Sequence, residues 1–145
     1  MTSIKYLKNE LETWLSSHPA NPKVFFEFTE QMPNLATMDE AYPLIFFAFN
    51  TSESYTNVIT HTFTVYCLDR IADDRSNIVD VVSEMQLLMN DIYLHFQTNH
   101  PVIDVIGLVS SEALNNFDLD YVGGWSAQIT FELPQICINY TNFGD

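Results

Sequence analysis

The feature that most constrains the fold is a run of apolar residues at helical spacing in the second half of the chain. These residues recur every three or four positions and are Ile78, Val79, Val82, Met85, Leu88, Met89, Ile92, Tyr93 and Phe96. The period predicts a helix of about 22 residues, roughly 33 Å long, with one apolar face. We expect it to end before Asn99-His100-Pro101, because the residue ahead of a proline disfavours helix.

Strand patterns lie on both sides of this helix and predict the layer that covers it. They span 24–29, 42–50 and 58–68 before the helix, and 102–109, 116–121 and 125–133 after it. The second and third are expected to pair as a hairpin, and the nearly continuous apolar run in 42–50 indicates a strand covered on both faces. In the last strand the core side is expected to hold Trp125, Ala127, Ile129, Phe131 and Leu133, which alternate with polar residues.

Local sequences predict where these elements begin and end. Gly123-Gly124 is expected to form the hairpin turn before the last strand, and Pro134 to end that strand. The charged segment 69–75 is expected to be a turn, and Ser76 and Asn77 can cap the helix that follows it.

A shorter helix is predicted at the start of the chain. Its apolar stripe is formed by Ile4, Leu7, Leu11, Trp14 and Leu15, and Pro19 and Pro22 end it near Ser17. The order of elements predicts an α+β fold with a mainly antiparallel sheet, on one face of which the N-terminal helix and the long central helix pack. The length favours a single domain over residues 1–145.

Composition excludes several classes of function. Nineteen acidic residues against five basic ones give a formal charge of −14, so the average surface repels phosphate and sequence-specific nucleic-acid binding is not expected. No stretch approaches the roughly 18 apolar residues of a membrane span. Hydrophobic residues make up 47% of the chain, which indicates a folded domain.

Motifs for catalysis, metals and cofactors were sought among the titratable residues. Four histidines, at 18, 61, 95 and 100, lack a second ligand at a metal-motif spacing, and the acidic groups at 69–74 and 118–120 lack the glycine and closing glutamate of a calcium loop. His61 is expected to be a partly buried, hydrogen-bonded strand residue. We therefore predict no enzyme, no cofactor, no metal and no catalytic residues.

A family resemblance rests on the order of elements and on several short segments. These are Tyr42-Pro43-Leu44-Ile45 entering a strand, Tyr66-Cys67-Leu68-Asp69 ending one, the long helix, and Tyr121-Val122-Gly123-Gly124-Trp125 before the alternating strand. The layout resembles that of tail terminator and neck (head-to-tail joining) ring proteins of tailed bacteriophages. The resemblance implies a non-catalytic virion protein, made in the host cytoplasm, that forms a homo-oligomeric ring (hexamer or dodecamer) with other phage neck or tail proteins, and DNA passing through its lumen.

Three polar segments beyond the core strands are expected to contact partners. They are the hairpin tip 51–57, the connection 110–116 and the tail 139–145, and the candidate interface residues in them are Ser52, Glu53, Tyr55, Glu112, Asn115, Asn142 and Phe143. Tyr55 and Phe143 are the expected anchors, because aromatic side chains dominate interface energetics. The alternative for each segment is a solvated loop.

Two other functions remain open from the sequence. A small acidic binding module or inhibitor would present carboxylates to a basic partner, and its affinity would fall steeply with salt. A small enzyme would need a pair of carboxylates converging in a pocket.

Overall fold

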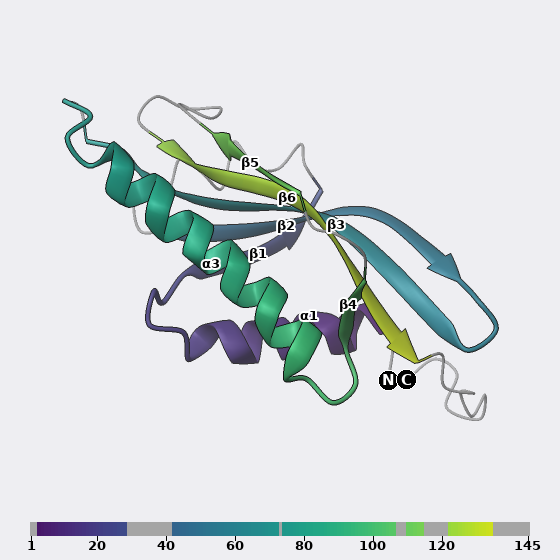
Figure 1. The fold of residues 1–145 in the computed structure, drawn as a ribbon. Helices are drawn as coiled ribbons and strands as arrows, with labels where there is room; N and C mark the ends of the chain where they lie inside the picture. The colour runs from purple at the N-terminus through teal and green to yellow at the C-terminus, as the bar shows by residue number, and fades with distance from the viewer. Residues whose placement is uncertain (1–2, 29–41, 73, 107–109, 115–121, 135–145) are drawn as a thin grey trace.

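A computed structural model describes residues 3–28, 42–72, 74–106, 110–114 and 122–134. The helices and strands in order are α1 (Ser3–Ser16), β1 (Lys23–Glu27), β2 (Leu44–Ser54), β3 (Val58–Arg70), α3 (Ile78–Thr98), β4 (Asp104–Ile106), β5 (Ser111–Leu114) and β6 (Val122–Pro134). The strands form one six-stranded sheet in the order β1-β2-β3-β6-β4, and β5 also pairs with β6 (Figure 1). The pairing is antiparallel except between β1 and β2, so the predicted α+β fold is confirmed.

The main core lies between one face of the sheet and the two helices. From α1 it receives Leu7, Leu11 and Leu15, all fully buried, and from α3 mainly Met85, Leu88, Met89, Ile92 and Phe96. The alternation predicted for the last strand is confirmed, since the side chains of Ala127, Ile129, Phe131 and Leu133 are buried on this face. Both helices therefore pack on the same side of the sheet, as the sequence predicts (Figure 1).

A smaller apolar cluster lies on the other side of the sheet. Its buried members are Leu44, Phe46, Ala48, Leu68 and Val122, and Phe25, Tyr42, Tyr66 and Leu114 pack against them. In β2, successive side chains therefore enter the two clusters alternately. The expectation that this strand is covered on both faces is confirmed for its first half.

The β2–β3 hairpin differs from the prediction, because the two strands are longer than expected. β2 continues through Ser54, so most of the predicted tip 51–57 is paired strand and the turn is short. A shift in register between Phe49 and Thr51 accommodates the extra residue. The serines and threonines beyond it were interpreted as a turn, although threonine is also a good strand former.

Gly123 and Gly124 do not form a hairpin turn. Both lie inside β6, opposite Asp69 and Leu68 of β3, and the predicted turn is wrong. Gly124 has φ +151°, and a Cβ atom there would overlap the carbonyl oxygen of Cys67. The glycine is thus required for the close approach of two backbones, a role of glycine in strands distinct from turn formation.

The start of α3 also departs from expectation. Asn77 occupies the N-cap position, but its side chain does not cap the helix. Its Oδ1 instead accepts the Ala72 N–H at 2.6 Å and its Nδ2 donates to the Arg70 carbonyl at 3.2 Å. On the helix itself Val79 is 77% exposed and Val81 is buried, so placing Val79 on the apolar face was wrong.

The strands after α3 were predicted less well. Only Asp104–Ile106 of the predicted strand 102–109 is strand in the described residues, and the predicted strand 116–121 lies outside them. Ser111–Leu114 was expected to be a connection and is strand β5, paired with β6. β6 ends at Pro134, as predicted, because proline cannot continue the ladder.

Candidate functional site

The outer parts of β2 and β3 form an arm that extends beyond both helices (Figure 1). We define the arm as residues 51–62. The Tyr55 N–H donates to the Val58 carbonyl at 2.8 Å and closes the turn at its tip. Near the tip, Ser52 and Glu53 are exposed, and Tyr55 is 54% exposed. The arm therefore presents three of the predicted interface residues together.

Tyr55 and Glu53 interact at the tip of the arm. The Tyr55 hydroxyl donates to Glu53 Oε2 at 2.5 Å. This hydrogen bond to a carboxylate raises the pKa of Tyr55, because loss of the phenolic proton would place two negative charges side by side. The two side chains thus form one acidic and aromatic unit at the end of the arm.

Cross-strand pairs hold the arm in register. Ser52 Oγ lies 2.5 Å from His61 Nδ1, and the hydroxyls of Thr62 and Thr130 lie 2.9 Å apart. His61 is buried, and burial lowers its pKa, so the imidazole is neutral at physiological pH. The prediction that His61 is a buried, hydrogen-bonded strand residue is confirmed.

An apolar groove of about 350 Å³ lies where the arm joins the body, and we call it the root groove. Its lining is formed by Ile4, Phe28, Phe49, Asn50, Thr51, Ser52, His61, Thr62 and Phe63. Phe28 is 57% exposed and packs edge-to-face on Phe49, with ring centroids 5.2 Å apart. Ile4 is 40% exposed at the start of α1. An exposed aromatic ring beside an open apolar groove is typical of a contact surface.

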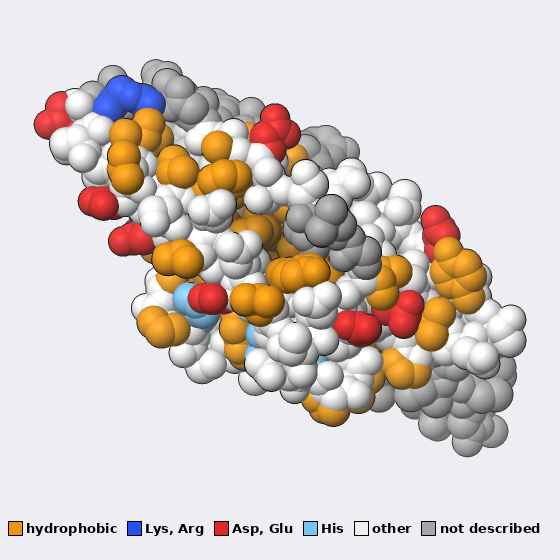
Figure 2. Space-filling view, in the orientation of Figure 1, with side chains coloured by type: hydrophobic (Ala, Val, Ile, Leu, Met, Phe, Trp, Pro, Cys, Tyr) orange, Lys and Arg blue, Asp and Glu red, His pale blue; other side chains and the backbone are white. Residues whose placement is uncertain are grey.

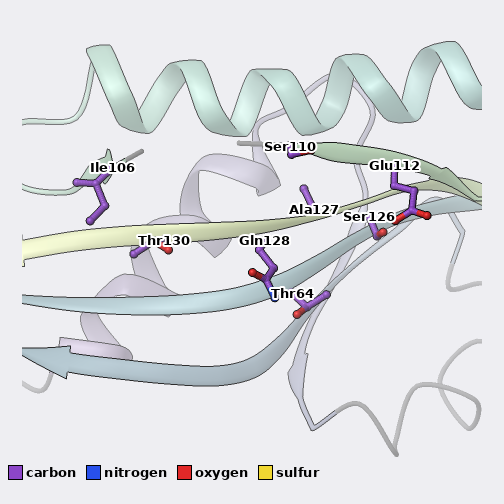
Figure 3. A pocket seen from close by; sticks show the side chains of 8 residues that line it. All are labelled: Thr64, Ile106, Ser110, Glu112, Ser126, Ala127, Gln128 and Thr130. Carbon is purple, nitrogen blue, oxygen red and sulfur yellow. The ribbon is translucent and has the colours of Figure 1, made fainter. Parts of the chain in front are cut away.

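A second, larger groove of about 700 Å³ lies on the sheet where the partner of β6 changes from β4 to β5. Three cross-strand pairs line most of it: Glu112 with Ser126, Thr64 with Gln128, and Ile106 with Thr130. Figure 3 shows Glu112 and Ser126 at one end, Gln128 and Thr64 in the middle, and Ile106 at the other end. The lining is mostly hydroxyl and amide groups, with Glu112 as the one acidic residue among the described lining residues.

The other histidines have structural partners that tie α1 to α3. His18 Nε2 lies 2.8 Å from Asp91 Oδ2, and its Nδ1 accepts the Ala20 N–H. His100 Nε2 lies 2.9 Å from Glu10 Oε1, and its Nδ1 accepts the N–H groups of residues 102 and 103. Because Nδ1 is an acceptor in both, each ring carries its proton on Nε2 and donates it to the carboxylate. His95 stacks on Trp14, with ring centroids 4.6 Å apart.

Charged groups do not converge on a reactive centre in the described part of the chain. Among residues 3–28, 42–72, 74–106, 110–114 and 122–134, no three His, Cys, Asp or Glu side chains lie close enough to hold a metal ion. Burial raises the pKa of Asp69, and the N–H of Ser76 lowers that of Asp74, which fits a structural turn before α3. Burial also raises the pKa of the free thiol of Cys67, which makes it unreactive.

The surface view shows where charge and apolar side chains are distributed. In Figure 2 the acidic side chains are spread over the visible face, and the visible basic side chains gather at the end where α3 begins. Apolar side chains lie along α3, which exposes Val79, Leu87 and Leu94. No helix in the described residues is long and apolar enough to cross a membrane.

The structure brings together only part of the predicted interface set. Ser52, Glu53 and Tyr55 lie on the arm, and Glu112 lies apart from them, on β5 at the polar groove. Asn115, Asn142 and Phe143 lie outside the described residues. The sequence interpretation missed the root groove, although Ile4 and Phe28, apolar residues at the ends of predicted elements, could have indicated it.

No protein-family model matches the chain, and no curated protein sequence matches it. Its function is therefore argued from the geometry of the arm, the grooves and the charge.

Proposed function

We propose that the protein is a non-catalytic structural subunit of a tailed-bacteriophage virion. It forms a homo-oligomeric ring at the neck or tail, in head-to-tail joining or tail termination, and DNA passes through the ring. The arm is the observation that carries this proposal. It extends a two-stranded ribbon beyond the helices and ends in exposed polar and aromatic side chains.

The energetics of the arm favour a contact role. Ordering a residue costs about 1–2 kcal/mol of backbone entropy, and an isolated two-stranded ribbon is marginally stable in water. Most arm residues are exposed or half-buried, so the ribbon recovers little of this cost by burial within its own subunit. A second surface packing on the arm would offset it, as subunit contacts in a ring do.

The charge is compatible with the same role. With 19 acidic and 5 basic residues, a ring of these subunits would have a strongly negative field. An acidic lumen repels phosphates and lets DNA slide without sticking, and acidic charge also keeps subunits apart before assembly. Either effect suits a ring subunit.

The alternative function is supported by the charge alone. A small acidic binding module or inhibitor with a net charge of −14 would attract a basic partner over long distances and lose affinity with added salt. It would work as a monomer or dimer. The two functions therefore differ in the mass of the protein in solution.

The test is the mass of the purified protein by light scattering, at low and moderate salt and over a range of concentrations. The ring function predicts a discrete closed species, with six or twelve subunits. A protein that stays monomeric under all these conditions, and that binds a basic protein with affinity that falls steeply with salt, would support the binding module instead.

A further inference from the structure

We propose that the root groove is the docking site for the arm of a second copy of this chain. In this contact Tyr55 of one copy fills the groove and Glu53 lies against Lys5 of the other. The inference rests on the self-association proposed above, and it identifies the two surfaces that meet.

The groove has the shape and chemistry to take an aromatic side chain. Its volume is about 350 Å³, and Ile4, Phe28 and Phe49 give it an apolar wall. Phe28 and Ile4 remain 57% and 40% exposed within the subunit. A tyrosine that enters such a groove buries its ring against apolar atoms and keeps its hydroxyl near the polar edge, where Asn50, Thr51 and Ser52 lie.

The charges around the groove are complementary to the arm tip. The chain has five basic residues, and two of them, Lys5 and Lys8, follow Ile4 within the first turns of α1. Lys8 is paired with Glu12 at 2.9 Å, whereas Lys5 is exposed and adjoins the lining residue Ile4. The acidic arm tip of another copy thus meets a cation here, on a molecule whose average surface would repel it.

The nearest carboxylate of the rim belongs to Glu27 and is turned away from this role. Its Oε1 accepts the backbone N–H of Phe28 at 3.1 Å, which holds the side chain against its own chain. The acceptor is therefore engaged in forming the groove wall.

The arm cannot reach the groove of its own subunit. Ser52 and Thr62, which line the groove, lie on the same two strands that carry Tyr55 at their tip. Three residues of extended strand separate Ser52 from Tyr55 by roughly 10 Å, and the paired strands cannot fold back over this distance. The occupant is therefore a second copy. A reciprocal exchange of arms would give a two-fold dimer, and a head-to-tail arrangement a ring.

The test is a charge exchange followed by mass photometry and sedimentation over a range of concentrations. The variants are Glu53→Lys, Lys5→Glu and the double variant. Each single change should weaken self-association by roughly tenfold or more, and the double variant should restore it to within about threefold. The two single changes alter the net charge in opposite directions, so general charge repulsion cannot produce the same loss in both.

Matched controls carry the same chemical changes elsewhere on the surface. Glu84→Lys on α3 and Lys23→Glu at the start of β1 are both at exposed positions, and Leu94→Ala is the control for Tyr55→Ala. The controls should assemble like the wild type, and Tyr55→Ala should not. Circular dichroism and thermal melting should show that all variants fold, because none removes a buried side chain.

The outcomes separate this contact from the ring itself. If the wild type forms a ring and the exchange variants do too, or if the double variant does not recover, the arm contact is wrong and the ring stands. If the wild type is a dimer with the exchange pattern described, the contact stands and the ring is wrong. A protein that stays monomeric at every concentration overturns both.

Discussion

Replacing Gly124 by alanine should be among the most damaging single changes outside the apolar core. The new Cβ would overlap the carbonyl oxygen of Cys67 and lie 3.0 Å from its carbonyl carbon and 3.2 Å from Leu68 Cα. All three atoms are backbone, so no side-chain rotation relieves the contact and β3 must move away from β6. Gly124 also has φ +151°, a conformation that alanine rarely adopts.

The size of the loss can be worked out from these contacts. Separating the strands at this point breaks one or two ladder hydrogen bonds, each costing about 1–3 kcal/mol when its groups stay buried. Backbone strain adds roughly 1–3 kcal/mol. We expect Gly124→Ala to lower the free energy of unfolding by about 3–6 kcal/mol, a large part of the 5–15 kcal/mol typical of a domain.

The neighbouring glycine provides the control. In Gly123→Ala the nearest atom to the new Cβ is Ile71 Cδ1 at 2.6 Å, the end of a side chain that can rotate, followed by the Leu114 carbonyl oxygen at 2.9 Å on the short edge strand β5. We expect a smaller loss of about 1–2 kcal/mol. Urea unfolding followed by tryptophan fluorescence measures both. A loss below about 1.5 kcal/mol for Gly124→Ala, or one no larger than for Gly123→Ala, would refute the reasoning.

Three further predictions follow from burial and charge. Phe47→Ala removes a fully buried ring and should lower the free energy of unfolding by about 3–5 kcal/mol, whereas Leu94→Ala at an exposed position should change it by less than about 0.5 kcal/mol; equal effects in urea unfolding would contradict the packing. Burial lowers the pKa of His61, so the unfolded chain binds more protons than the folded one near pH 6.5, and stability should fall between about pH 7.5 and 5.5. His61→Gln should lose less over the same interval, and an unchanged pH dependence would show that His61 does not contribute. Raising ionic strength should promote self-association, because it screens repulsion between subunits of charge −14; association that weakens with salt would mean that ion pairs control the interface.

The elements with strong periodicity could be predicted from the sequence. The helix at Ile78–Thr98, the helix at Ser3–Ser16 and the alternation in β6 all bury one apolar face, and that requirement is visible as a period of 3.6 or 2. The fold class follows from their order. The central hairpin was also predicted, because its two strands are long and apolar.

Features that depend on contacts between distant segments could not be predicted. Gly123-Gly124 has the composition of a turn, and only the approach of the Cys67 carbonyl shows why glycine is needed inside a strand. Asn77 has the composition of a cap, but its side chain binds the loop at Arg70 and Ala72.

The candidate site shows the same division. Ser52, Glu53 and Tyr55 were identified from their polarity and their place between two strands, and the structure places them on one arm. The root groove was not found, because Ile4, Phe28 and Phe49 are far apart in the sequence and become neighbours only when α1, β1 and β2 pack. Contributions of Asn115, Asn142 and Phe143 remain predictions of the sequence.

The most direct test of the proposed role is electron microscopy of the purified, negatively stained protein at moderate salt and high concentration. The account predicts closed rings with a central opening, in which class averages show one rotational symmetry consistent with six or twelve subunits. Fields that contain only single subunits or two-fold dimers, from a preparation that is folded by circular dichroism, would contradict it.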